Sequence, residues 1–262
     1  MANKIREPAV AGLFYPSDAG VLKKQVQGYL QKAEPTAIFP KAMIVPHAGY
    51  IYSGPVAASA YKSLESRQNR IRRIVLLGPS HRVPFYGLAL SEAQVFKTPL
   101  GDVKIDHSLD DKLLKLSFVQ KSDLPHRQEH SLEVQLLFLQ MLLKDFELIP
   151  LVVGEASAEE VAQVLGILWG SEDTLIVISS DLSHYHDYET ARTRDQKTAQ
   201  AIEKFLPEKL KQEDACGRHP IRGLLVAAKA KHLKVKRLDL RNSGDTAGSK
   251  DQVVGYGAWV FY

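Results

Sequence analysis

Cysteine is almost missing from this 262-residue sequence, which contains only Cys216. A disulfide within the chain is therefore impossible, and zinc sites built from several cysteines are excluded. Such a chain is expected in a reducing compartment, the cytoplasm. No apolar run approaches the roughly 20 residues of a membrane-spanning helix. Residues 1–8 also lack the apolar centre of a signal peptide.

The sequence also lacks the glycine-rich signatures of nucleotide-binding loops. Neither Gly-x-Gly-x-x-Gly nor Gly-x-x-x-x-Gly-Lys occurs, so nothing favours nucleotide-dependent chemistry. The basic stretches at 67–73 and 229–237 lack the interleaved aromatic residues of single-strand binders. The net charge of +4 is mild for this length. We therefore expect neither nucleic acid nor membrane as a partner.

The residues that are present indicate an ordinary globular protein. Hydrophobic residues make up 45% of the chain and charged residues 24%, which excludes a disordered or collagen-like chain. No internal repeat and no Ser/Gly-rich linker interrupts the sequence. A single domain over residues 1–262 is the simplest organisation for this length.

Short aliphatic runs alternate with helical patterns along the chain. Helices are expected near 18–30, at 132–143 behind a Ser131 cap, at 158–169 behind a Ser157 cap, and from a first turn at Pro55. Further helices are expected at 189–205 and 221–231. Buried strands are expected at 43–45, 74–77, 148–153, 175–178, 236–240 and 253–262, with edge strands at 87–90 and 103–105. The alternation predicts an α/β fold, with a mostly parallel or mixed central sheet flanked by helices.

Histidine and aspartate follow four of these strands. His47 follows the first, His81 the second, Asp181 and His184 the fourth, and Asp245 the fifth. Parallel strands bring their carboxyl ends to one sheet edge, where α/β proteins bind ligands. We therefore expect these side chains to converge in one cleft.

Two imidazoles and one carboxylate form the facial triad of non-haem Fe(II) sites. Two of these histidines and one of the carboxylates would match such a site, with Fe(II) as the expected metal. Zn²⁺ on the same residues would also keep an open coordination position. His184 would then be free as an acid or base near neutral pH, and Asp181 would orient it or bind substrate.

Structural alternatives exist for the main candidates. The histidines that follow strands would otherwise only form hydrogen bonds within their loops. Asp181 would otherwise cap the next helix, and Asp245 would otherwise be a turn residue. His130 starts a predicted helix and is expected to cap it and pair with Glu133 rather than face the cleft.

Two further residues are expected to have structural positions. Cys216 fits a buried structural thiol better than a nucleophile, since His219 is the only base close to it in sequence. His126 is expected to be an exposed loop residue.

Seven ordered motifs carry a resemblance to a known family. They lie at 6–16, 46–54, 77–81, 129–133, 179–184, 216–220 and 242–245. On these residues the chain resembles the Memo family, in particular its microbial members called AmmeMemoRadiSam system protein B. The resemblance covers nearly the whole chain.

The Memo family is similar in structure to the class III extradiol dioxygenases, which use non-haem Fe(II). The resemblance implies His47, His81 and Asp245 as metal ligands, with Asp181 and His184 in the same cleft. The animal relative has a cysteine within about one residue of the Asp245 position. Thiolate favours copper and zinc, whereas carboxylate favours Fe(II) or Mn(II), so this chain looks closer to the dioxygenases.

Three functions are compatible with such a cleft. The first is a metal-dependent oxidoreductase acting on an unidentified substrate. The second is a binding or adaptor module for phosphotyrosine-like or other anionic peptides, with Arg218 and the histidines as donors. The third is a Zn²⁺ hydrolase. The family name further implies radical-SAM and AMMECR-type proteins as partners.

Overall fold

A mixed sheet of nine strands forms the centre of the computed structural model, which describes residues 4–262. The strand order is β10-β12-β2-β9-β3-β8-β4-β7, with β11 also paired to β12. These strands are β2 (Ala42–Val45), β3 (Arg73–Pro79), β4 (Leu88–Leu90), β7 (Val119–Lys121), β8 (Glu147–Val153), β9 (Thr174–Ser179), β10 (His184–His186), β11 (Val235–Asn242) and β12 (Val253–Phe261). A second sheet contains β1 (Ile5–Arg6), β5 (Val95–Thr98) and β6 (Gly101–Lys104).

The four central strands are parallel. β2 pairs with β9, β9 with β3 and β3 with β8, all in the same direction. β12 runs antiparallel to both β2 and β11, so β11 has the same direction as β2. The carboxyl ends of the central strands therefore meet at one edge, as expected for a ligand-binding α/β sheet.

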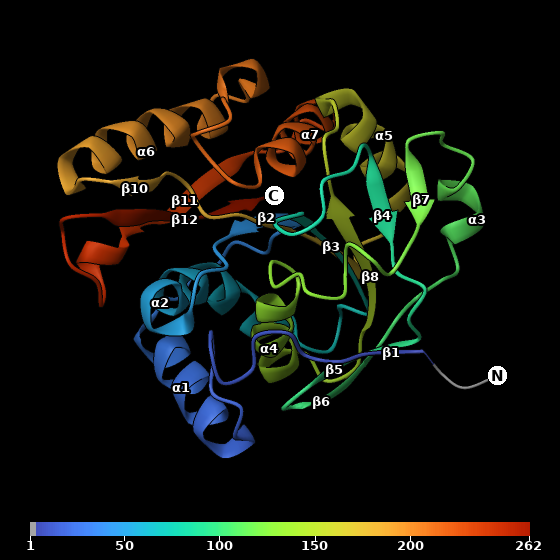
Figure 1. The fold of residues 1–262 in the computed structure, drawn as a ribbon, viewed down its shortest axis with the longest axis horizontal. Coiled ribbons are helices and arrows are strands. Elements are labelled where there is room, and N and C mark those ends of the chain that lie inside the picture. The colour runs from blue at the N-terminus through green and yellow to red at the C-terminus, as the bar shows by residue number, and fades with distance from the viewer. Residues whose placement is uncertain (1–3) are drawn as a thin grey trace.

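Helices cover both faces of the sheet (Figure 1). Alternate residues of β2 enter opposite cores: Met43 and Val45 pack on one face, Ala42 and Ile44 on the other. The first core is covered by α1 (Ala19–Lys32), α2 (Tyr50–Tyr61) and α4 (Glu133–Leu142), and the second by α5 (Ala158–Leu168), α6 (Tyr188–Glu203) and α7 (Arg218–Ala230). Shorter helices are η1 (Lys62–Arg67), α3 (Asp110–Leu113), η2 (Pro207–Lys209) and η3 (Ser243–Asp245). The predicted α/β fold with a mixed, helix-flanked sheet is confirmed.

Local predictions differ in outcome. Ser157 caps α5 as predicted, in a reciprocal capping box with Glu160. Ser131 does not cap α4, because its hydroxyl donates to the Pro79 carbonyl at 2.9 Å instead. Pro55 lies inside α2 rather than in its first turn, since that helix already begins at Tyr50.

The predicted edge position of 87–90 is also wrong. This segment forms β4, which lies between β8 and β7. β7 was missed because its three residues include only one apolar side chain, Val119.

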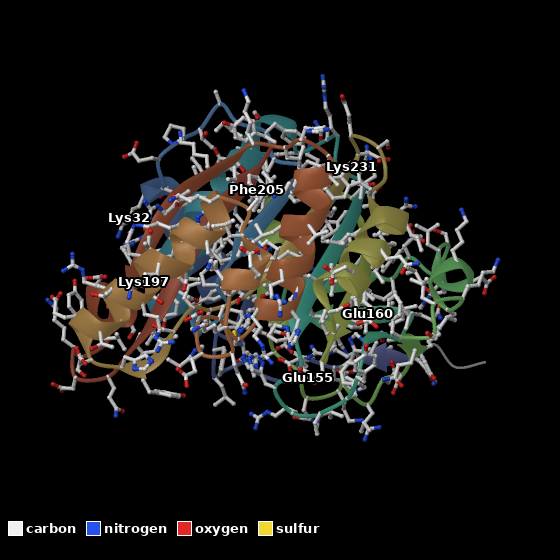
Figure 2. All side chains as sticks on the ribbon, turned by 90° about the horizontal axis from the view of Figure 1, so that it is seen from above. Lys32, Glu155, Glu160, Lys197, Phe205 and Lys231 are labelled. Carbon is white, nitrogen blue, oxygen red and sulfur yellow. The ribbon has the colours of Figure 1, made fainter. Side chains whose placement is uncertain are left out.

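The outer surfaces of the helices are polar. Figure 2 looks onto the layer of α5, α6 and α7 and shows Lys197 on α6 and Lys231 at the end of α7, both exposed. Within residues 4–262, no helix is both long enough and apolar enough to cross a membrane.

Candidate metal centre

A cleft of about 650 Å³ opens where β2, β3 and β9 end. His47, His81, Asp181 and His184 all line it, as the order of the parallel strands predicts. The imidazole rings of His47 and His81 lie 5.2 Å apart between centroids. The structure therefore brings together four of the five predicted site residues.

Asp245 is the exception, because it does not line this cleft. Its carboxylate accepts the backbone N–H of Asn242 at 3.0 Å and the Tyr188 hydroxyl at 2.5 Å. The first contact closes a capping box around η3, which holds the carboxylate on the outer side of the turn. Ser243, two residues earlier, lines the cleft instead. The structure thus does not place Asp245 as the third ligand beside the two histidines.

Cys216 occupies the place beside the histidines. Its Sγ lies 3.2 Å from His47 Nε2 and accepts the Asp181 backbone N–H at 3.3 Å. One donor atom each from His47, His81 and Cys216 lies within 4.8 Å of the others. The sequence favoured a buried structural thiol over a nucleophile at Cys216, and this grouping with the two histidines was not predicted.

The loop before α7 positions Cys216 by a close backbone contact. The Gly217 N–H donates to Ser180 Oγ at 2.9 Å, just after β9. A Cβ on Gly217 would lie 2.6 Å from the Ser180 Cβ, so only glycine allows the loop to approach this closely. The glycine after the only cysteine was the one sequence signal for this contact.

A hydroxyl network determines which nitrogen of His47 is free. Ser179 Oγ donates its single hydrogen to the Ser131 carbonyl at 2.6 Å and accepts from the Gln135 amide at 2.7 Å. Its 2.9 Å contact with His47 Nδ1 must therefore have the imidazole as donor. The lone pair of His47 Nε2 then points at Cys216 Sγ.

Glu129 orients His81 in the same way. Its carboxylate accepts from His81 Nδ1 at 2.8 Å and from the His81 backbone N–H at 2.6 Å. Although burial opposes ionisation, these hydrogen bonds and the nearby His81 lower the pKa of Glu129 to about 2. An ionised carboxylate behind an imidazole is the usual outer support of a metal-binding histidine.

Burial and neighbouring groups shift the pKa values of the three donors differently. Burial, followed by the nearby histidines, holds the pKa of His47 well below its usual range. Burial also lowers the pKa of His81, but hydrogen bonds to Cys216 and Glu129 outweigh it and raise that pKa to about 10. Burial raises the pKa of the Cys216 thiol. A metal at this site must therefore displace protons, which makes its binding pH-dependent.

Asp181 supports the backbone of the cluster. One carboxylate oxygen accepts the N–H groups of His47 at 2.7 Å and Ala48 at 3.3 Å. Burial raises the pKa of Asp181, and the nearby His184 opposes that shift. His184 begins β10, opposite Val254 of β12, and lines the cleft.

Aromatic side chains form much of the cleft wall, and Arg82 adds a cation. The aromatic lining residues are Phe14, Tyr52, Tyr185 and Tyr256. Tyr185 is 72% exposed and has a left-handed backbone with φ of 60°. Flat apolar surfaces beside a cation suit an aromatic group that carries negative charge.

Buried Glu133 ties the chain's first segment to this wall. Its carboxylate accepts the Ala9 N–H at 2.7 Å and the Val10 N–H at 3.0 Å, and it also binds the Arg6 guanidinium and the Tyr15 hydroxyl. This network holds Phe14 near His130, with 4.7 Å between ring centroids.

The neighbouring histidines and Arg218 depart from their predicted positions. His130 does not pair with Glu133; it lines the cleft and stacks on His81 at 4.7 Å between centroids. His126 is buried rather than exposed, with Nε2 2.9 Å from the Ala89 carbonyl oxygen. Arg218 pairs with Glu155 at 3.2 Å and does not line the cleft.

Comparison with known proteins agrees with this architecture. The family model described as Memo-like protein matches residues 6–260. The chain belongs to the Memo family. A relative from Aquifex aeolicus, named MEMO1 family protein, is 39% identical over 98% of this chain and 99% of its own length. Other MEMO1 family proteins, from Methanosarcina mazei (98% and 99% covered) and Sulfolobus acidocaldarius (96% and 97%), are 36% and 35% identical.

A solved structure shares the fold of this Memo family member. Uncharacterized protein JW3007 from Escherichia coli K12 superposes with a TM-score of 0.55. The match covers 84% of this chain and 99% of the other, at 13% sequence identity. At that identity the likeness concerns the fold alone.

Proposed function

We propose that this Memo family member is a metal-dependent oxidoreductase whose metal is held by His47, His81 and Cys216. The proposal depends on one observation, the three donor atoms within 4.8 Å of one another. Ser179 accepts a hydrogen bond from Nδ1 of His47, and Glu129 accepts one from Nδ1 of His81. The Nε2 atom of each imidazole is therefore left for the metal.

The set of donor atoms changes which metal is expected at the site. The prediction of Fe(II) depended on the Asp245 carboxylate, and a thiolate in its place favours copper or zinc. Copper or iron would supply redox chemistry at a position open to the cleft. Zinc alone would instead favour hydrolysis, because bound zinc lowers the pKa of water.

The protein side chains supply binding and proton transfer. The aromatic wall and Arg82 favour a phenolic or other anionic aromatic small molecule. His184 lines the same cleft and takes the hydroxyl proton of such a substrate onto its imidazole. Asp181 holds the backbone of His47 and Ala48 while this happens.

Metal content after anaerobic purification tests the proposal. Wild type and Asp245→Ala should each carry about one metal per chain, whereas His81→Ala and Cys216→Ala should carry almost none. Loss of metal in Asp245→Ala with retention in Cys216→Ala would overturn the ligand assignment. Absence of uptake of Fe(II), Zn²⁺ and copper by wild type would overturn the metal centre itself.

The peptide-binding alternative has one supporting observation. Arg218 is paired outside the cleft, but Arg82 lines it and offers a contact for an anionic group. Phosphotyrosine binding that survives metal removal and His47→Ala would favour this alternative. Partnership with radical-SAM and AMMECR-type proteins stays a prediction from the family resemblance.

A further inference from the structure

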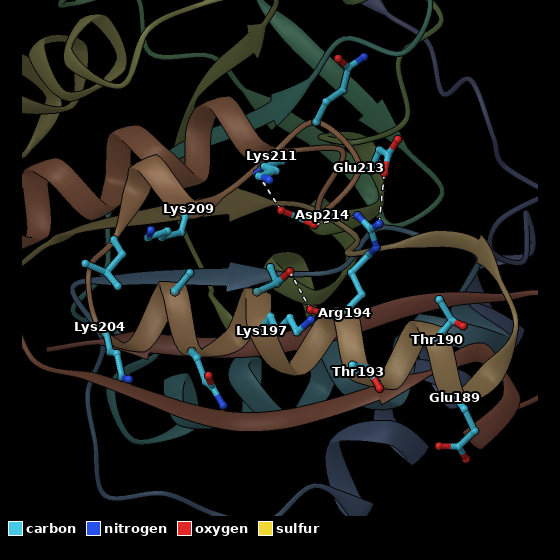
Figure 3. Close-up of a pocket in the computed structure, with 15 residues that line it drawn as sticks. Glu189, Thr190, Thr193, Arg194, Lys197, Lys204, Lys209, Lys211, Glu213 and Asp214 are labelled. Carbon is cyan, nitrogen blue, oxygen red and sulfur yellow. Dashed lines mark hydrogen bonds and ion pairs between the residues drawn. The ribbon is translucent and has the colours of Figure 1, made fainter.

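A second hollow lies beside α6 and shares no lining residue with the first cleft. It is a groove of about 1040 Å³ between α6 and the returning segment 204–214 (Figure 3). It is larger than the metal cleft, which has about 650 Å³. The proposed metal chemistry uses none of its residues.

Unpaired lysines surround this groove. Lys197, Lys204, Lys209 and Lys211 line it and are exposed. Among residues 4–262, no carboxylate forms an ion pair with any of their ammonium groups. The four charges therefore lie around a common hollow without a carboxylate partner in the described part of the chain.

The acidic residues of the groove are already paired with arginines. Arg194 binds Glu213 at 3.2 Å and Asp214 at 3.0 Å, as Figure 3 shows for the first pair. Arg192 binds Glu189 at 3.3 Å. The net field in the groove is therefore positive, and a bound anion would relieve the repulsion among the lysines.

Backbone geometry and hydrogen bonds shape the groove walls. Phe205 has a left-handed backbone with φ of 52°, which reverses the chain after α6. The Leu206 N–H then donates to the Ala201 carbonyl at 2.9 Å, and the Lys211 N–H donates to Asp214 at 2.8 Å. Ala201 and Leu206 add apolar surface to the lining.

We propose that this groove docks an acidic segment of a partner protein. Its carboxylates would pair with the four lysines, and an apolar side chain would contact Leu206. A protein segment fits better than nucleic acid for two reasons. No aromatic side chain lines the groove for base stacking, and three carboxylates lie among the lysines, where a continuous phosphate backbone would meet them.

A labelled acidic peptide tests this proposal with the full-length chain. The probe is a fluorescein-labelled nonapeptide of three Glu-Glu-Leu repeats, titrated in anisotropy at low and high salt. The groove variant carries Lys→Gln at Lys197, Lys204, Lys209 and Lys211. The matched control carries Lys→Gln at four other exposed lysines, Lys23, Lys24, Lys112 and Lys115. Each variant has a net charge of 4 − 4 = 0.

The expected result is a loss of at least tenfold in affinity for the groove variant and less than threefold for the control. Binding should weaken with salt, because exposed charges carry it. Circular dichroism melts are the control for folding, and both variants should melt at the wild-type temperature. Equal weakening in both variants, or no binding by wild type, would overturn the proposal. A preference for single-stranded DNA over the peptide, lost in the groove variant alone, would overturn it in favour of nucleic acid.

Discussion

The candidate metal cleft and the groove lined by four lysines differ in whether their polar side chains have hydrogen-bond or ion-pair partners. In the cleft, His47 and His81 each have a hydrogen-bond partner behind the ring, Ser179 and Glu129. In the groove, the ammonium groups have no carboxylate partner in the described chain. Preorganised donors suit a small ligand or an ion, whereas unpaired surface charges suit a partner that brings its own charge.

Helix α6 links the two regions, because it carries Lys197 of the groove and the buried Asp195. This buried carboxylate accepts the Ser183 N–H at 3.1 Å, one residue before His184. Thus α6 presents lysine to the groove on one side and supports the cleft loop on the other.

The largest predicted effect concerns buried charge in the cleft wall. Glu133→Ala leaves the buried Arg6 without its partner and should cost about 3–5 kcal/mol of unfolding free energy. Lys204→Gln in the groove should change it by less than about 0.5 kcal/mol. Urea denaturation measures both, and a loss below about 1 kcal/mol for Glu133→Ala would contradict the comparison.

A smaller effect is predicted for the loop that carries Cys216. In Gly217→Ala the new Cβ would meet Ser180 at 2.6 Å, which should cost about 1–3 kcal/mol and weaken metal binding about tenfold. Gly166→Ala on α5 is the control, because nothing lies within 4 Å of its new Cβ. It should gain about 0.5–1 kcal/mol. Unchanged metal affinity in Gly217→Ala would show that the loop tolerates displacement.

The third prediction concerns the pH dependence of stability at Asp195. Burial raises the pKa of Asp195 to about 6, above its usual value of 3.8. The folded state therefore binds this proton more tightly, and its stabilising contribution is lost as the pH rises from about 4 to 6. The amide of an Asp195→Asn variant does not titrate, so it has no such loss, and its oxygen can still accept the Ser183 N–H.

The measurement compares Asp195→Asn with wild type in urea at pH 4.5 and pH 7.5. The stability difference should move by about 2 kcal/mol in favour of the variant at the higher pH. A difference that does not change with pH would mean that the carboxyl is solvated in the folded state.

The convergence of His47, His81, Asp181 and His184 was predictable from the sequence. Each follows an aliphatic run, and parallel strands have no choice but to end at one edge. Asp245 was not predictable in this way, although β11 runs in the same direction as β2. The turn of η3 decides where its carboxylate points, and that depends on a hydrogen bond to the Asn242 backbone.

The burial of single polar residues could not be predicted from the sequence either. His126 looked like a loop residue because its neighbours are polar, yet it is 1% exposed. Its burial depends on the second sheet and on the carbonyl of Ala89, which lies 37 residues away. Sequence periodicity indicates which side of a helix or strand a residue faces, and His126 lies in neither a helix nor a strand.

By itself the sequence determined the alternation of strands and helices, the mixed sheet and the sheet edge that carries the chemistry. These follow from local periodicity and from the geometry of parallel strands, which act over a few residues at a time. Tertiary structure decided the third donor of the proposed metal site, because Cys216 reaches the histidines only when the loop before α7 packs on the end of β9. The contact between Cys216 and His47 joins residues 169 positions apart, and no local sequence pattern encodes it.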